Sequence, residues 1–167
     1  MIFLGLDPGT IRIGYGVVAR EGASFRYRAG GILDVSGNLH ERLSQIEPSL
    51  KKLVRQFRPD MAIIETLIFA KNKKTAMQVA EGRGALIATL VRCGLPLIEL
   101  APSSVKAAVA GSGNASKQAV AKMVWYTLQM PPPEESLVDD ATDALALAIA
   151  GALHYTHPQY TSSKRSP

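Results

Sequence analysis

Four acidic residues stand where a folded chain could gather them into one site. Asp7 and Glu65 each end an apolar run, Ile2–Leu6 and Met61–Ile64, that is typical of a buried strand. If the two strands are neighbouring and parallel, both carboxylates lie on the same edge of a sheet. Simpler explanations stay open for each residue alone, because Asp-Pro-Gly is a common turn and Glu65 can mark where the chain leaves the core.

The other two acids, Asp140 and Asp143, are three residues apart, which puts both on one face of a helix expected over 140–154. Acids near a helix N-terminus are favoured by the helix dipole, and that alternative explains some acid here. It does not explain why Asp143 precedes the apolar stretch Ala144–Ile149. Asp139, four residues before Asp143, competes with Asp140 for the same role.

Four converging carboxylates would repel one another, and the repulsion would raise some of their pKa values. A hard divalent cation removes that repulsion, and Mg²⁺, with Mn²⁺ as the alternative, prefers oxygen ligands. Two such ions about 3.5–4 Å apart can activate a water and stabilise the leaving oxygen of a phosphodiester. The one cysteine, Cys93, and the scattered histidines offer no competing site, and His154 and His157 are expected on the surface.

Charge is unevenly distributed along the 167 residues, which carry a net charge of +5. Residues 71–125 hold eight basic and two acidic groups, whereas residues 126–167 hold two basic and five acidic groups. A basic region beside an acidic cluster suits a polyanion-binding surface around a metal site, and a solvated face is the alternative. No apolar run is long enough to span a membrane and no leader is apparent, so we expect a soluble cytoplasmic protein.

The apolar pattern predicts three strands, then helices separated by two more strands. A hairpin at Glu21–Gly22 followed by β–α–β crossovers indicates a five-stranded mixed sheet with helices on both faces. Pro48 is expected to kink or divide its helix, and a serine of Pro102–Ser104 is expected to cap the short helix over 102–110. The expected strands are 2–6, 13–19, 25–35, 61–64 and 95–100, and the expected helices are 39–57, 75–93, 102–110, 116–128 and 140–154.

An ordered set of short motifs resembles the RuvC family of Holliday-junction resolvases. The resemblance covers about residues 1–155 and is carried by Leu4–Thr10, Gly14–Gly16, Ile64–Glu65, Phe69–Asn72, Gly82–Gly84, Val105–Lys106, Lys117 and Asp140–Ala146. It implies a ribonuclease-H-like α/β nuclease domain over 1–155. It also implies a homodimeric, Mg²⁺-dependent endonuclease that cuts two opposed strands of a four-way DNA (Holliday) junction during homologous recombination and repair. The polar residues 156–167, which include Pro158 and Pro167, are expected to form a flexible tail.

The resemblance also assigns roles to individual residues. The catalytic and metal-binding carboxylates would be Asp7, Glu65, Asp140 and Asp143, with two ions bound during catalysis. Because Pro131–Glu135 looks like an insertion before the aspartate pair, Asp139 stays an alternative to Asp140.

Other residues would contact DNA. Lys106 and Lys117 would neutralise backbone phosphates, and Lys71, Lys73 and Lys74 would flank the DNA channel. Phe69 is the candidate for stacking on junction bases, although the order Ile68–Phe69 shifts the aromatic by one position. The small-residue helix 75–93 is the candidate dimer interface, and a branch-migration motor complex is a partner implied by the resemblance alone.

Three alternatives remain at this point. The first is a related ribonuclease-H-like nuclease acting on other branched or RNA-containing DNA. The second is a phosphotransferase, because Asp7–Thr10 also resembles the phosphate loop of actin-like ATPases and sugar kinases, although no second phosphate motif follows. The third is a binding module that recognises junctions without cutting them, which added Mg²⁺ would distinguish from a nuclease.

Overall fold

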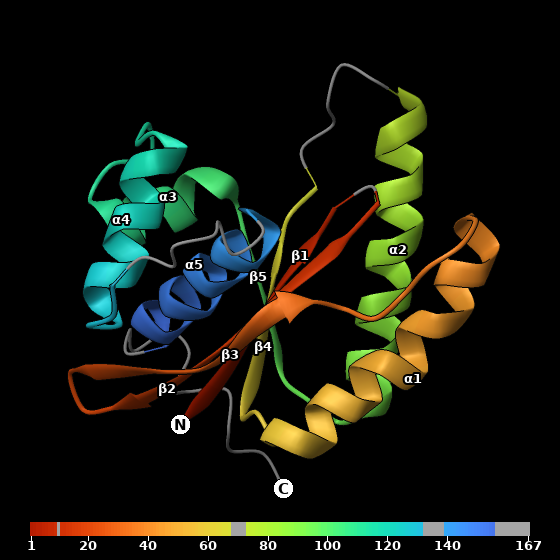
Figure 1. The fold of residues 1–167 in the computed structure, drawn as a ribbon, viewed down its shortest axis with the longest axis horizontal. Helices are drawn as coiled ribbons and strands as arrows, with labels where there is room; N and C mark the ends of the chain where they lie inside the picture. Colours follow the sequence, from red (N-terminus) through yellow and green to blue (C-terminus); the bar gives the residue numbers. More distant parts are fainter. Residues whose placement is uncertain (10, 68–72, 132–138, 156–167) are drawn as a thin grey trace, which may run out of the picture.

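A computed structural model describes residues 1–9, 11–67, 73–131 and 139–155, with only the backbone of 73–75. Five strands form one mixed sheet in the order β3-β2-β1-β4-β5 (Figure 1). Antiparallel pairing joins β1 to β2 and β2 to β3, whereas β1, β4 and β5 are parallel. The expected mixed sheet is therefore confirmed. The strands are β1 (Ile2–Pro8), β2 (Ile13–Glu21), β3 (Ser24–Ile32), β4 (Met61–Glu65) and β5 (Leu97–Leu100).

Helices cover both faces of this sheet, as expected (Figure 1). On one face lie α1 (Leu39–Phe57) and α2 (Lys73–Arg92). On the other lie α3 (Pro102–Ala110), α4 (Lys117–Thr127) and α5 (Asp139–His154). The last helix packs directly on β1 and β2, while α3 and α4 pack against α5.

Strand alternation decides which face each side chain joins. Phe3 and Ile63 belong to the core cluster beneath α5, whereas Leu4 and Leu6 belong to the cluster beneath α1 and α2. Because successive side chains of a strand point to opposite faces, Asp7 shares the face of Phe3, and Glu65 shares that of Ile63. Both acids therefore point toward α5.

Glycines in the strands let the backbone of α5 lie close to the sheet. A Cβ atom at Gly5 would lie 2.0 Å from the carbonyl oxygen of Ala144. At Gly14, which pairs with Asp7 across the β1–β2 ladder, it would lie 2.1 Å from the carbonyl oxygen of Asp140. Any larger residue would push the first turns of α5 outward, so these glycines help to set the distance between the aspartates of α5 and the sheet.

Two local expectations have different outcomes. Of the two effects expected from Pro48, a division of the helix does not occur: α1 is continuous over 19 residues, and it bends along its course in Figure 1. The start of α3 has Ala101 at the N-cap with no side-chain hydrogen bond, so the expected serine cap is wrong. Pro102 instead occupies the first turn, where its missing N–H costs nothing.

Candidate active site

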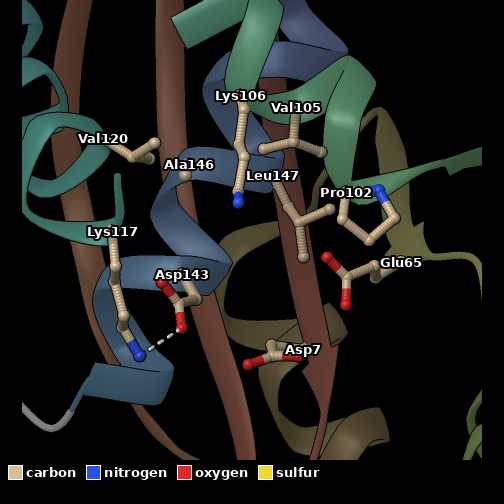
Figure 2. A pocket seen from close by; sticks show the side chains of 10 residues that line it. All are labelled: Asp7, Glu65, Pro102, Val105, Lys106, Lys117, Val120, Asp143, Ala146 and Leu147. Atoms are coloured by element: carbon tan, nitrogen blue, oxygen red, sulfur yellow. Dashed lines mark ion pairs between the residues drawn. The ribbon is translucent and has the colours of Figure 1, made fainter. Parts of the chain in front are cut away.

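A pocket of about 210 Å³ lies between the sheet and the helices α3, α4 and α5. Asp7 from β1, Glu65 from β4 and Asp143 from α5 reach it from three separate elements, and Figure 2 shows them converging on one space. Two lysines line the same pocket, Lys106 from α3 and Lys117 from α4. The remaining wall is mostly apolar and consists of Pro102, Val105, Val120, Ala146 and Leu147.

The two candidates for the fourth acid occupy different places. Asp140 does not line the pocket, but its negative charge is one of those that raise the pKa of Asp7. Asp139 is exposed, and its Oδ2 lies 3.5 Å from Nζ of Lys117. Asp140 is therefore coupled to Asp7, whereas Asp139 is coupled to the lysine.

Asp7 is the most perturbed carboxyl group of the pocket. Burial, followed by the charges of Glu65, Asp143 and Asp140, raises its pKa from 3.8 to about 7, and Lys117 offsets only part of that rise. A buried carboxylate with three acidic neighbours is costly to ionise, so Asp7 is only partly ionised near neutral pH unless positive charge enters the pocket. The pKa of Glu65 is also raised, by burial and then by Asp143, and Lys106 counteracts this rise.

Lys117 forms an ion pair with the acid on α5. Its Nζ lies 2.9 Å from Oδ2 of Asp143, the contact drawn as a dashed line in Figure 2. Burial acts to lower the pKa of Lys117, but the hydrogen bonds and charges of Asp143 and Asp139 outweigh it and raise that pKa. The lysine therefore stays protonated and occupies one carboxylate oxygen of Asp143.

The donor set suits a hard cation by its chemistry. Within the described ranges, no three acidic, histidine or cysteine side chains are grouped closely enough to hold a metal ion as they stand. The carboxylates of Asp7, Glu65 and Asp143 nevertheless supply only oxygen ligands, and their mutual repulsion is the condition that a divalent cation relieves. The residues fit such an ion once Asp143 releases Lys117.

Several predicted residues cannot be placed in the site. Phe69 and Lys71 lie outside the described residues, as do His157 and the tail over 156–167. Lys73 and Lys74 begin α2, and their side chains are not described.

The expectation that His154 is a surface group is wrong. The residue is half-buried, and its Nε2 is buried without a hydrogen-bond partner among the described residues. Sequence reasoning also missed the positioning role of Gly14. The signal was available, because Gly14 and Gly16 are two apart on a strand and therefore share one face.

A mixed sheet in this order, with acids from β1, β4 and α5 in one pocket, defines an α/β protein of the ribonuclease-H-like class. The family model described as crossover junction endodeoxyribonuclease RuvC matches residues 3–151. The chain belongs to this family and is a nuclease of that kind.

Relatives and solved structures agree with this membership. A crossover junction endodeoxyribonuclease RuvC from Chloroflexus aggregans is 41% identical over 160 residues, covering 93% of each chain. The RuvC of Tolumonas auensis is 37% identical over 161 residues, covering 96% of this chain and 89% of the relative. The structure of Thermus thermophilus RuvC in complex with a Holliday junction substrate superposes with a TM-score of 0.82 at 32% identity, covering 92% of this chain and 94% of that one.

A more distant structure shares the fold alone. The yeast mitochondrial Holliday junction resolvase Ydc2 superposes with a TM-score of 0.66 at 17% identity, covering 95% of this chain and 82% of that chain. Among the described helices, none is both long and apolar enough to cross a membrane.

Proposed function

We propose that this protein resolves four-way (Holliday) DNA junctions by metal-dependent hydrolysis of two opposed strands, during homologous recombination and repair. The observation that carries the proposal is the meeting of Asp7, Glu65 and Asp143 in one pocket flanked by Lys106 and Lys117. The Thermus thermophilus relative, solved in complex with a Holliday junction substrate, supports this choice of DNA. An enzyme with this substrate would work in the cytoplasm.

Asp7, Glu65 and Asp143, together with Asp140, would hold Mg²⁺ or Mn²⁺, with two ions bound during catalysis. Bound ions of this kind make a water acidic enough to attack phosphorus and neutralise the charge that develops on the phosphate oxygens. Asp7 would give up its proton when a cation enters, because the repulsion that raises its pKa is then relieved. Asp139 contacts Lys117 and would not be a metal ligand.

The lysines would contact the DNA backbone. Lys106 and Lys117 line the acidic pocket from two different helices, so a phosphate entering it would meet positive charge from both. Release of Lys117 from Asp143 would free its ammonium group to bind that phosphate. Phe69, Lys71, Lys73 and Lys74 remain predicted DNA contacts, on the resemblance and the basic charge of this region.

Dimerisation through α2 is part of the proposal. The exposed positions of this helix include an apolar or small stripe at helical spacing, Met77, Ala80, Gly84, Ala88 and Val91, beside the charged residues Glu81 and Arg92. A Cβ atom at Gly84 would meet no atom within 4 Å, so packing inside the chain does not require glycine there. Glycine costs a helix about 1 kcal/mol relative to alanine, and close approach of a second helix would explain it. A two-fold dimer would match a junction with two equivalent strands.

The test is cleavage of a labelled synthetic four-way junction beside a linear duplex of the same sequence and a branched RNA-containing substrate. Paired symmetric nicks on the junction alone, in Mg²⁺ and not in EDTA, are the expected result. Preference for the RNA-containing substrate would favour the related nuclease, and binding without nicks would favour the non-cleaving module.

The family match argues against the phosphotransferase. A branch-migration complex stays a partner inferred from the resemblance.

A further inference from the structure

Arg83 on α2 is a charged side chain largely withdrawn from water, with 17% of its surface exposed. The helix covers the sheet face opposite α5 (Figure 1), and Arg83 reaches from it to the edge where β4 ends. Taking a guanidinium group out of water is costly unless it is hydrogen-bonded and paired. Its contacts must therefore account for its position.

Two contacts fix the guanidinium group. Its Nε donates a hydrogen bond to the main-chain carbonyl oxygen of Glu65 at 3.0 Å. Its Nη2 forms an ion pair and hydrogen bond with Oε2 of Glu99 on β5. Because the group is planar and rigid, two bonds from separate nitrogens set its orientation and tie α2 to both strands.

The carbonyl group that Arg83 binds lies at the point where the chain leaves the sheet. Glu65 is the last residue of β4 and pairs with Leu100 of β5. Beyond it, the N–H of Thr66 donates to the carbonyl of Leu100 at 2.9 Å. The Glu65 carboxylate points into the pocket on the α5 side (Figure 2), whereas Arg83 approaches the backbone from α2. Arg83 therefore restrains the position of the Glu65 carboxylate indirectly, by holding the main chain of the same residue.

The Glu65 carboxylate needs such restraint. It shares one pocket with the carboxylates of Asp7 and Asp143, and negative charges so close together repel one another. A misplacement of roughly 1 Å in a reacting constellation can cost about 100-fold in rate. A fixed strand end keeps Glu65 at the pocket wall despite this repulsion.

We propose that Arg83 is a positioning residue for Glu65, holding the main-chain carbonyl at the end of β4 while Glu99 holds the guanidinium group. The inference rests on the proposed nuclease function of the pocket. The proposal gives α2 a role in the active site, although this helix covers the opposite face of the sheet.

The test compares Arg83→Gln with wild type in junction cleavage with Mg²⁺ and in junction binding in EDTA. The expected result is a fall in kcat of about 10- to 100-fold, with KM and junction affinity within about two-fold of wild type. The affinity of the DNA-free protein for Ca²⁺, measured by calorimetry, should also fall. Arg92→Gln is the matched control, because it removes an α2 ion pair with Glu47, neither residue lines the pocket, and kcat should be unchanged.

Arg83→Lys separates positioning from a contact with DNA phosphate. A lysine keeps the charge but cannot bond both the carbonyl and Glu99 as a fork, so kcat should stay low. Glu99→Gln, which disturbs only the exposed partner, should lower kcat about two- to five-fold in the same direction. A normal kcat in Arg83→Gln, or a defect confined to KM and restored by Arg83→Lys, would overturn the inference alone. A wild-type protein that cuts no junction would overturn the proposed function as well.

Discussion

Nζ of Lys117 lies 2.9 Å from Oδ2 of Asp143, so an ammonium group contacts the carboxylate that a divalent cation would bind. Lysine and cation cannot share that oxygen without repulsion. The pair therefore stabilises the pocket without metal and opposes metal entry. It also keeps a positive charge beside the place where a phosphate would bind.

The first prediction concerns this competition. Lys117→Met should bind Ca²⁺ or Mg²⁺ more tightly than wild type in the absence of DNA, because Asp143 loses its competing partner. Cleavage should nevertheless fall, by about 10- to 100-fold, since the phosphate loses its counter-charge. Calorimetry and single-turnover cleavage measure the two effects. Lys122→Met on the same helix is the control, and weaker metal binding in Lys117→Met would contradict the competition.

The second prediction is a pH dependence of stability. The pKa of Asp7 is raised from 3.8 to about 7 in the folded protein, so the folded state binds a proton more tightly than the unfolded state. Stability is therefore lost as pH rises through that interval. Asp7→Asn removes the loss and should stabilise the metal-free protein near neutral pH, by on the order of 1–3 kcal/mol.

Urea unfolding in EDTA at about pH 4 and about pH 7.5 measures this difference. The gain from Asp7→Asn should grow between the two pH values and then level off. Asp34→Asn, which replaces an exposed aspartate that does not line this pocket, is the control substitution. A gain that is constant with pH, or largest in acid, would show that the Asp7 carboxyl is not perturbed in this way.

The third prediction separates the two neighbouring aspartates. Asp140→Asn should abolish cleavage and leave junction binding intact, because the charge of Asp140 is coupled to Asp7. Asp139→Asn should retain cleavage, because that side chain is exposed and contacts Lys117 instead. Nicking and gel-shift assays on the same junction measure both properties. The reverse pattern would make Asp139 the ligand.

The fourth prediction concerns the α2 stripe. Gly84→Leu should convert the proposed dimer to a monomer in sedimentation velocity, because a leucine would hold the two α2 helices apart. Gly84→Ala is the milder control and should weaken the dimer less while favouring the helix itself. If Gly84→Leu forms dimers over the same range of protein concentration as wild type, the interface lies elsewhere.

The sequence predicted those parts of the site that depend on local pattern. Asp7 and Glu65 end apolar strands, and strand alternation with parallel pairing was enough to bring them together. The spacing of Asp140 and Asp143 correctly indicated one helix. These features depend on the spacing of apolar and acidic residues over a few positions, which can be read from the sequence directly.

The parts that the sequence did not predict depend on contacts between distant residues. The close approach of α5 to the sheet needs Gly14 beneath Asp140, which is visible only once the helix is placed. The bond from Arg83 to the Glu65 carbonyl and the pairing of Lys117 with Asp143 are also long-range. Local preference was insufficient even at the start of α3, where Ala101 rather than the expected serine is the N-cap residue and Pro102 follows in the first turn.

The central claim is that the converging carboxylates form a metal-dependent junction-cleaving site. The most direct measurement is an Mg²⁺ titration of nicking and binding on one labelled junction, with wild-type and Asp7→Asn proteins. The account predicts that wild type makes paired nicks as Mg²⁺ is added, whereas Asp7→Asn binds the junction with similar affinity and leaves it intact. Equal nicking by Asp7→Asn, or nicking by wild type in EDTA, would contradict it.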